Sequence, residues 1–122
     1  MARFSRRIRP AVQRELDASA REESLGNVRA AFGHLERAHV LGQMATAFHV
    51  RVHWLMLCWA VRHRQPREAV GQLTRIVGAA TKTAMGWVPQ GNTGGSNVSP
   101  FRRMPIPVEL QKQLDSARAD TR

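Results

Sequence analysis

The chain of 122 residues has one cysteine, no tyrosine and only two lysines. Because the single thiol of Cys58 cannot form an internal disulfide, a reducing cytoplasm is the simplest location to expect. No run of eighteen apolar residues is present, so no membrane-spanning segment is expected. The N-terminal segment is basic but lacks the apolar stretch of a secretory signal peptide. These scarcities favour one small intracellular domain.

The composition is strongly basic, with 19 Lys and Arg residues against 9 Asp and Glu residues and a net charge of +10. Such an excess suits an acidic partner such as nucleic acid or an anionic surface. The basic residues are scattered, however, and the four phenylalanines do not alternate with them as on a nucleic-acid platform. A GC-rich genome, which enriches arginine over lysine, explains the bias equally well. Nucleic-acid binding is therefore an alternative that the sequence does not favour.

Apolar residues recur at helical spacing through most of the chain and predict an all-α fold. Gly26, Gly42 and Gly86 mark expected helix ends. Residues 87–107 are rich in Gly, Pro and Asn and predict an irregular tail. The tail also carries apolar residues that could anchor it on the helices, namely Trp87, Phe101, Met104 and Ile106. The expected elements are a basic arm (1–9), a four-helix core (10–86, with helices over 10–25, 28–41, 45–63 and from 66), the tail (87–107) and a short last helix (108–119).

An internal echo indicates how the four core helices are arranged. Residues 26–38 match residues 64–76 in register, with Leu35 on Leu73 and Arg37 on Arg75. The first of these stretches resembles the second helix of a tetratricopeptide repeat, a helix pair that stacks on its neighbours. We therefore expect a single domain of two stacked antiparallel helical hairpins.

Metal-competent side chains gather on both sides of the expected turn at Gly42. His49 and His53 are four residues apart and share one helical face, the spacing at which two imidazoles bind one ion. Glu36 and His39 are three residues apart and also share a face. In an antiparallel hairpin, His39 and His49 lie level with each other, since they are equally far from the turn. The pattern predicts that rings from two helices converge.

A mononuclear site of His39, His49 and His53, with Glu36 as fourth ligand or outer partner, fits this pattern. Zinc or copper suits such ligands. A di-iron site is disfavoured because it needs two Glu-x-x-His pairs, and no carboxylate occurs between Glu36 and Glu68. In the alternative reading each histidine is a core residue bonded to a backbone carbonyl. Clustering favours the metal, because several buried imidazoles without a shared ion or network are costly.

Other motifs are weaker. His34 is expected at the rim of the cluster and His63 at a helix end, so neither is assigned as a ligand. Cys58 lies in the most apolar helix and is expected to be a buried, inert thiol. A glycine-rich loop could form an anion nest from its backbone N–H groups, although a tight structural loop is the simpler reading. Its residues are Gly91, Asn92, Thr93, Gly94 and Gly95.

Several strings together resemble a small bacterial family: Glu36-Arg-Ala-His39, His49, His53-Trp-Leu-Met56, Gly91-Asn-Thr-Gly-Gly95-Ser-Asn-Val-Ser-Pro100-Phe and Met104-Pro-Ile-Pro107. The family is catalogued as domain of unknown function 3703, and the resemblance covers nearly the whole chain. Its members tend to be encoded near heavy-metal resistance genes, which implies a link to metal handling. The resemblance supplies no activity and no site residues.

Three functions follow in order of support. The first is a cytoplasmic metal-binding protein that senses, buffers or transfers an ion. The second is a helical adaptor for a protein or an acidic partner, with structural histidines. The third, a metalloenzyme, lacks an identifiable general base. A protein partner and a homo-oligomer both stay open.

Overall fold

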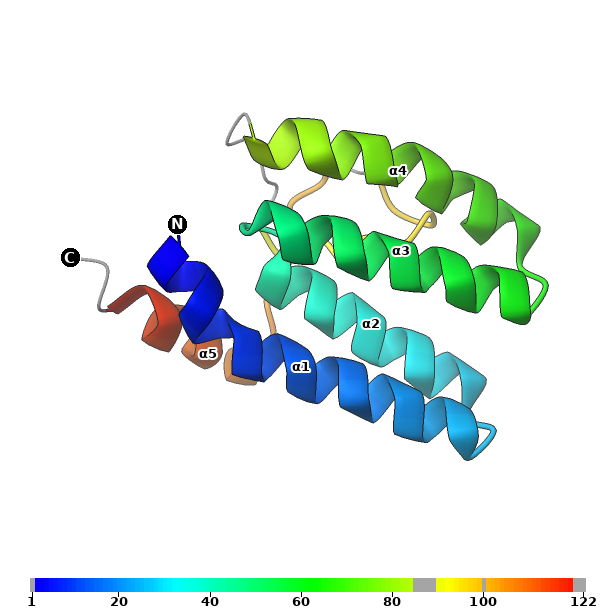
Figure 1. The fold of residues 1–122 in the computed structure, drawn as a ribbon, viewed down its shortest axis with the longest axis horizontal. Helices are drawn as coiled ribbons and strands as arrows, with labels where there is room; N and C mark the ends of the chain where they lie inside the picture. Colours follow the sequence, from blue (N-terminus) through cyan, green and yellow to red (C-terminus); the bar gives the residue numbers. More distant parts are fainter. Residues whose placement is uncertain (1, 85–89, 100, 120–122) are drawn as a thin grey trace.

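The computed structural model describes residues 2–84, 90–99 and 101–119, and within these ranges it contains five helices and no strand (Figure 1). The all-α prediction is confirmed. Each expected core helix and the short last helix is present, with bounds within two residues of expectation except at the start of the first. The expected end at Gly86 lies outside the described residues. The helices are α1 (Ala2–Ser24), α2 (Val28–Gly42), α3 (Thr46–Arg62), α4 (Pro66–Ala84) and α5 (Val108–Ala119).

The expected basic arm over residues 1–9 is wrong, because α1 already begins at Ala2 and passes through Pro10. Proline inside a helix removes one backbone hydrogen bond and strains the preceding turn. Here Phe4 and Ile8 continue the apolar stripe of Ala11 and Val12, and all four side chains are buried. Burial of that stripe outweighs the cost of the proline, and the arginines of this segment lie along an ordered helix.

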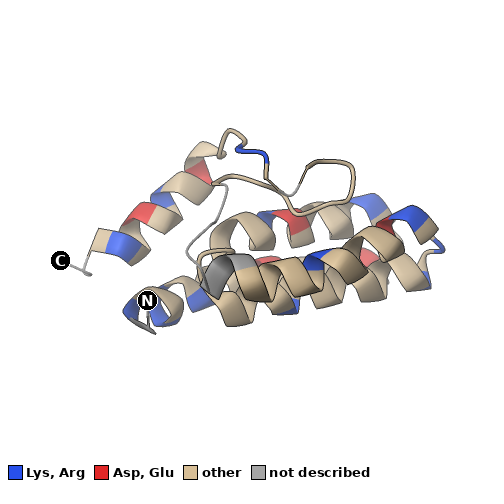
Figure 2. Ribbon diagram, turned by 90° about the horizontal axis from the view of Figure 1, so that it is seen from above, with Lys and Arg blue, Asp and Glu red and all other residues tan. Residues whose placement is uncertain are grey.

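The first four helices form one layer in which α1 pairs with α2, α2 packs on α3 and α3 pairs with α4 (Figure 1). This is the expected pair of antiparallel hairpins. The tail leaves α4 and returns across one face of the layer, so that α5 lies on α1 and α2 (Figure 2). The chain thus has a covered face and an open face. No described helix is both long and apolar enough to cross a membrane.

The core is centred on α1, α2 and α3, where aromatic rings join the hairpins. Trp59 of α3 packs against Phe32 of α2 with ring centroids 4.4 Å apart. Its indole N–H donates to the carbonyl of Val28, 3.1 Å away, so the large ring is buried without an unpaired donor. An ion-pair cluster ties the elements at the edge: Arg37 on α2 binds both Glu15 of α1 and Glu109 of α5.

The tail packs closely against the helices, as expected, though not through every expected anchor. Ile106 packs against the core, whereas Phe101 is 53% exposed, and Trp87 lies outside the described residues. Two glycines permit the close approach. A Cβ on Gly71 of α4 would lie 2.4 Å from Ser96 Cβ, and a Cβ on Gly94, whose φ is +82°, would lie 2.4 Å from His39 Cδ2. The tail backbone therefore rests directly on the helices.

Leu114→Ala tests the docking of α5. Leu114 is buried, and its truncation leaves a cavity that should lower the free energy of unfolding by about 2–5 kcal/mol. Urea unfolding of the wild type and the variant measures the change. The exposed Val108 on the same helix is the control, since Val108→Ala should change stability by less than about 0.5 kcal/mol. An unchanged urea midpoint in Leu114→Ala contradicts the docking of α5.

Gly94→Ala tests the packing of the tail on His39. The added methyl group meets the imidazole at a backbone conformation that alanine rarely adopts, so we expect a loss of about 1–3 kcal/mol of stability. Gly33→Ala in α2 is the matched control, because its Cβ meets nothing within 4 Å and alanine favours the helix by about 0.5–1 kcal/mol. Thermal unfolding with a chelator present separates the two variants, and equal stability of both contradicts the contact.

Candidate metal centre

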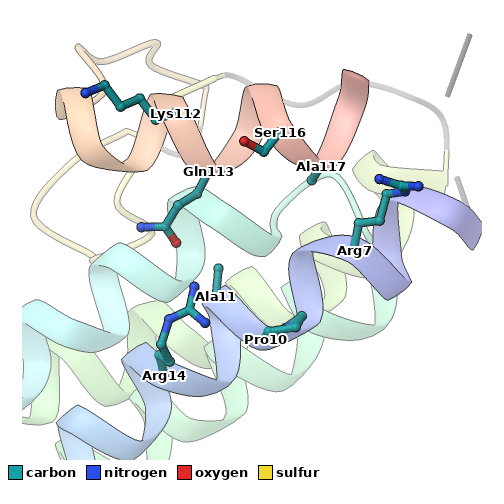
Figure 3. A pocket seen from close by; sticks show the side chains of 8 residues that line it. All are labelled: Arg7, Pro10, Ala11, Arg14, Lys112, Gln113, Ser116 and Ala117. Atoms are coloured by element: carbon teal, nitrogen blue, oxygen red, sulfur yellow. The ribbon is translucent and has the colours of Figure 1, made fainter. Parts of the chain in front are cut away.

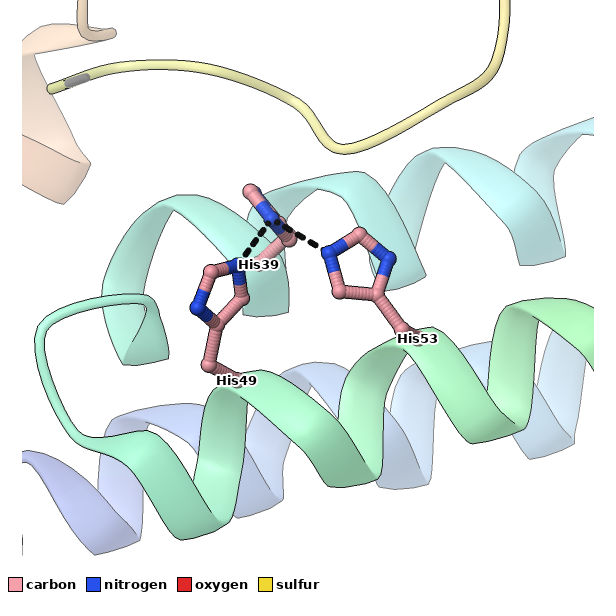
Figure 4. Close-up of side chains that lie close together, drawn as sticks. All are labelled: His39, His49 and His53. Atoms are coloured by element: carbon pink, nitrogen blue, oxygen red, sulfur yellow. Dashed lines mark hydrogen bonds between the residues drawn. The ribbon is translucent and has the colours of Figure 1, made fainter. Parts of the chain in front are cut away.

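Three imidazole rings from two helices converge under the tail (Figure 4). His39 projects from the last turn of α2, and His49 and His53 project from successive turns of α3. Each of the three side chains is only 3% exposed. Because α2 and α3 are joined by a short turn, positions equally far from that turn face each other, as the sequence spacing predicts. These three residues form the one group of potential metal ligands among the described residues, and we call it the histidine triad.

The spacing of the nitrogen atoms suits one shared ion. Nε2 of His39 lies 3.0 Å from Nε2 of His49 and 3.1 Å from Nε2 of His53. One potential ligand atom from each of the three histidines can be chosen so that the three atoms lie within 4.8 Å of one another. Nitrogens that share a tetrahedral zinc ion at about 2.0–2.1 Å are themselves about 3.3–3.4 Å apart. An ion therefore requires the closest pairs to separate by only a few tenths of an ångström.

The partners of the opposite ring nitrogens fix two of the tautomers. Nδ1 of His39 lies 2.6 Å from the backbone carbonyl oxygen of Asn92, and Nδ1 of His53 lies 2.6 Å from Oε1 of Gln72. Carbonyl and amide oxygens only accept hydrogen bonds, so both Nδ1 atoms carry the proton. In neutral rings the Nε2 atoms of His39 and His53 are then both unprotonated, and their lone pairs face each other. Such a pair is repulsive unless a cation or an additional proton lies between them.

Gln72 connects the triad to α4 and to the tail. Its amide oxygen accepts from His53, while its Nε2 group donates to Oε2 of Glu68 at 2.7 Å and to the Gly94 carbonyl at 2.9 Å. Oε2 of Glu68 also accepts from the backbone N–H of Ser96 at 2.9 Å. Because the oxygen and the nitrogen of the Gln72 amide both form hydrogen bonds, these partners fix which way the amide is oriented. This is the kind of outer partner that orients a metal-binding histidine and increases its basicity.

Asn92 holds the loop over His39. Its side-chain amide donates to the carbonyls of Ser99 and Arg102, and its Oδ1 accepts from the N–H of Gly94 at 2.9 Å. The loop is thereby closed so that its own backbone carbonyl points at the imidazole. The anion nest expected over residues 91–95 stays a prediction. These contacts favour a role for the loop in positioning His39. The Gly94 N–H already donates to Asn92 Oδ1, and the carbonyl of Asn92 accepts from His39.

Glu36, expected as a fourth ligand or an outer partner, does not belong to the triad's group of ligand atoms. Burial raises the pKa of its carboxyl group, while the charge of Arg29 and a hydrogen bond with Thr93 act to lower it. Thr93 follows Asn92 in the loop over His39. The contact therefore favours the outer role, in which Glu36 supports the loop.

The remaining histidines have other partners. His34 Nδ1 lies 3.0 Å from Glu15, and His63 Nε2 lies 3.1 Å from Glu23, which also binds Arg62. The carboxyl group of Glu23 has a lowered pKa, chiefly because Arg62 donates to it. Cys58 is half-buried rather than buried, and it too lies outside the group of potential ligands.

The sequence analysis did not identify Gln72 and Asn92. A signal for Gln72 exists: Ala69, Gln72, Ile76 and Ala79 follow helical spacing on the inner side of α4, so a polar side chain interrupts an otherwise apolar face. Other large apolar side chains of the same helix, Val70, Leu73 and Val77, are exposed. Asn92 acts through its backbone carbonyl, and no side-chain pattern encodes that contact.

Comparison with known proteins identifies the family of the chain but not its function. No curated protein and no solved structure is detectably similar to it. The likeness of its hairpins to tetratricopeptide repeats therefore stays a prediction. A family model described as a protein of unknown function, DUF3703, matches residues 6–114, which include the triad, Gln72 and the whole loop over His39. The chain belongs to the DUF3703 family.

Proposed function

We propose that the protein binds one transition-metal ion through the Nε2 atoms of His39, His49 and His53. The observation that carries this proposal is the convergence of three buried Nε2 atoms, with Nε2 of His39 lying 3.0 Å from that of His49 and 3.1 Å from that of His53, while the Nδ1–H groups of His39 and His53 donate hydrogen bonds elsewhere. A structural core histidine needs one hydrogen bond to a backbone carbonyl. It does not need two further imidazoles whose nitrogens approach its second ring nitrogen. A cation converts the repulsion into shared coordination.

The donor set restricts the class of ion. Three imidazole nitrogens suit Zn(II) and copper, whereas Mg(II) and Ca(II) prefer oxygen ligands. Neither the carboxylate of Glu36 nor the thiol of Cys58 belongs to the described group of ligand atoms. Hydrogen bonds that the Nδ1–H groups of His39 and His53 donate to Asn92 and Gln72 hold two rings in the orientation that aims Nε2 at the shared position. Zinc and copper are therefore the ions to test first.

The position of the triad supports a role in holding and passing on an ion. The rings are buried, and the loop that contains Asn92 and Gly94 lies against His39. Release of an ion then requires movement of a segment that is itself hydrogen-bonded to the ligands' partners. Buffering or transfer of a metal ion, as in heavy-metal handling or resistance, fits such a centre better than rapid turnover of a substrate.

A second function, binding of a protein partner, is favoured by a separate observation. Helices α3 and α4 carry five large apolar side chains that are exposed, as the contact surfaces of adaptors do. An adaptor role does not conflict with metal binding, because these side chains are exposed whereas the triad is buried. They are Trp54, Val61, Val70, Leu73 and Val77.

Elemental analysis of the protein purified without a histidine tag tests the proposal. We expect about one zinc or copper ion per chain after loading and dialysis, and His53→Ala should weaken metal binding by more than about 100-fold, beyond the usual effect of an outer partner. His34→Ala is the matched control, since it removes an equal imidazole that is bound to Glu15 outside the triad. Competition with a chromogenic chelator measures the affinities.

Equal metal content in His53→Ala, His34→Ala and the wild type contradicts the proposal. If His53→Ala does not fold, the cobalt-loaded wild type still provides a test. Tetrahedral coordination by imidazole produces intense visible bands, and a spectrum typical of hydrated cobalt contradicts a shared site.

Gln72→Leu tests the outer hydrogen bond. Leucine has a similar shape but cannot accept a hydrogen bond from the Nδ1–H group of His53, so metal affinity should fall by about 10–100-fold while the triad itself is retained. Gln65→Leu, which removes an exposed amide at the start of α4, is the control. Both affinities are measured by chelator competition, and equal values in the two variants mean that Gln72 does not orient His53.

A further inference from the structure

Three polar side chains on one face of α4 hold the tail in place over the triad. Glu68, Gln72 and Arg75 are four and three residues apart, so they share a face of the helix. Each bonds to the tail backbone, Glu68 as an acceptor and the other two as donors. Their tail partners, in the same order, are the Ser96 N–H at 2.9 Å, the Gly94 carbonyl at 2.9 Å and the Val98 carbonyl at 2.7 Å.

Glu68 joins the tail to the triad through a single oxygen atom. Its Oε2 accepts both from the Ser96 N–H at 2.9 Å and from Nε2 of Gln72 at 2.7 Å. Gln72 in turn accepts from the Nδ1–H group of His53. A continuous chain of hydrogen bonds therefore runs from the tail backbone through two side chains of α4 to one of the three imidazoles.

The tail is the cover of the triad that can move at least cost to the core. Helices α2 and α3 are held together by packed aromatic rings, whereas the contacts of the tail described above are hydrogen bonds. The groove of about 420 Å³ between α1 and α5 is lined only by residues of those two helices, so it does not lead to the histidines (Figure 3). Movement of the tail is therefore the least disruptive way for an ion to reach or leave the buried rings.

Gly71 lets the tail come close enough for this chain of hydrogen bonds to form. A Cβ at this position would lie 2.4 Å from Cβ of Ser96, which is closer than two such atoms can approach. A methyl group on residue 71 would therefore push Ser96 away from α4 while leaving Glu68, Gln72 and the triad chemically unchanged. The position of the tail can thus be altered separately from the carboxylate that binds it.

We propose that Glu68 is a positioning residue that couples the tail to the triad and thereby controls the exchange of the bound ion, an inference that rests on the proposed metal binding. While Oε2 of Glu68 holds both Ser96 and Gln72, the Gln72 amide keeps His53 in its ligand orientation and the tail covers the ion. When Ser96 moves away, the cover and one support of Gln72 are lost together. The ion then leaves only after the tail has opened.

The test is the rate at which the zinc-loaded full chain loses its ion to an excess of a chromogenic chelator in a stopped-flow experiment. We expect a rate that does not depend on chelator concentration, because opening of the tail limits it. Glu68→Ala should increase the rate by about tenfold or more, as expected for the loss of a hydrogen bond to a charged group. Gly71→Ala should also increase it, because the added methyl group displaces Ser96.

Two further variants separate the proposed role from a general effect of the substitution. The amide oxygen of Glu68→Gln can still accept from Ser96 and Gln72, so this variant should restore most of the wild-type rate. Glu22→Ala is the matched control, since it removes a carboxylate that binds Asn27 next to the turn between α1 and α2, and it should release zinc as the wild type does.

NMR of the metal-free protein tests the coupling without an ion. In Glu68→Ala we expect hydrogen exchange of the Ser96 amide to become about tenfold faster and the signal of the His53 Nδ1–H group to shift, whereas Glu68→Gln should keep both close to the wild type. Faster exchange with an unchanged His53 signal overturns the coupling, because Glu68 then only holds the tail.

Equal zinc release from the wild type, Glu68→Ala and Gly71→Ala also overturns the inference, as does a rate that rises in proportion to chelator concentration. If Glu68→Ala does not fold, Gly71→Ala decides the same question with the carboxylate in place. A wild-type protein that binds no zinc contradicts the proposed function instead, and the metal-free measurements then still decide whether Glu68 couples the tail to His53.

Discussion

Two hydrogen bonds to ring nitrogens determine what the centre of this protein can do. The Asn92 carbonyl and the Gln72 amide oxygen accept hydrogen bonds from the Nδ1–H groups of His39 and His53, so that in neutral rings the unprotonated Nε2 atoms lie 3.1 Å apart. Without these acceptors either ring could donate to the other, and the cluster would be an ordinary buried hydrogen-bond network. With them, Nε2 rather than Nδ1 of both rings is turned toward the shared position. The outer partners, rather than the number of histidines, are what favours the proposed metal centre over a polar core.

The same hydrogen bonds explain why an irregular segment is packed so tightly. A buried imidazole pair needs acceptors, and helices have few free carbonyls to offer, since theirs are used within the helix. The tail supplies the carbonyls of Asn92 and Gly94, and Glu68 in turn accepts from the tail at Ser96. Glycines at 71 and 94 allow that approach. The loop and the histidines therefore form one hydrogen-bonded unit, in which the loop carbonyls accept the hydrogen bonds of the polar side chains beneath them.

Periodicity predicted the parts of this arrangement that depend on side chains in regular helices. The four-residue spacing of His49 and His53, and the equal distances of His39 and His49 from the turn, were sufficient to bring the three rings together. The start of α1 differs from the expected one at residue 10, because burial of Phe4 and Ile8 extends the helix past Pro10 to Ala2. Gln72 and Asn92 were not predicted for another reason. Their histidine partners are far away in the sequence, and Asn92 contacts His39 only through its backbone carbonyl.

The return of the tail also sets the position of α5. The loop over His39 and the helix that faces α1 belong to one continuous segment, so the path that places Asn92 on the triad also places α5 against α1 and α2. Arg37 fastens that return, because it binds Glu109 of α5 while it is held by Glu15 of α1. One ion-pair cluster thus ties α1, α2 and α5 together at the end of the segment that covers the triad.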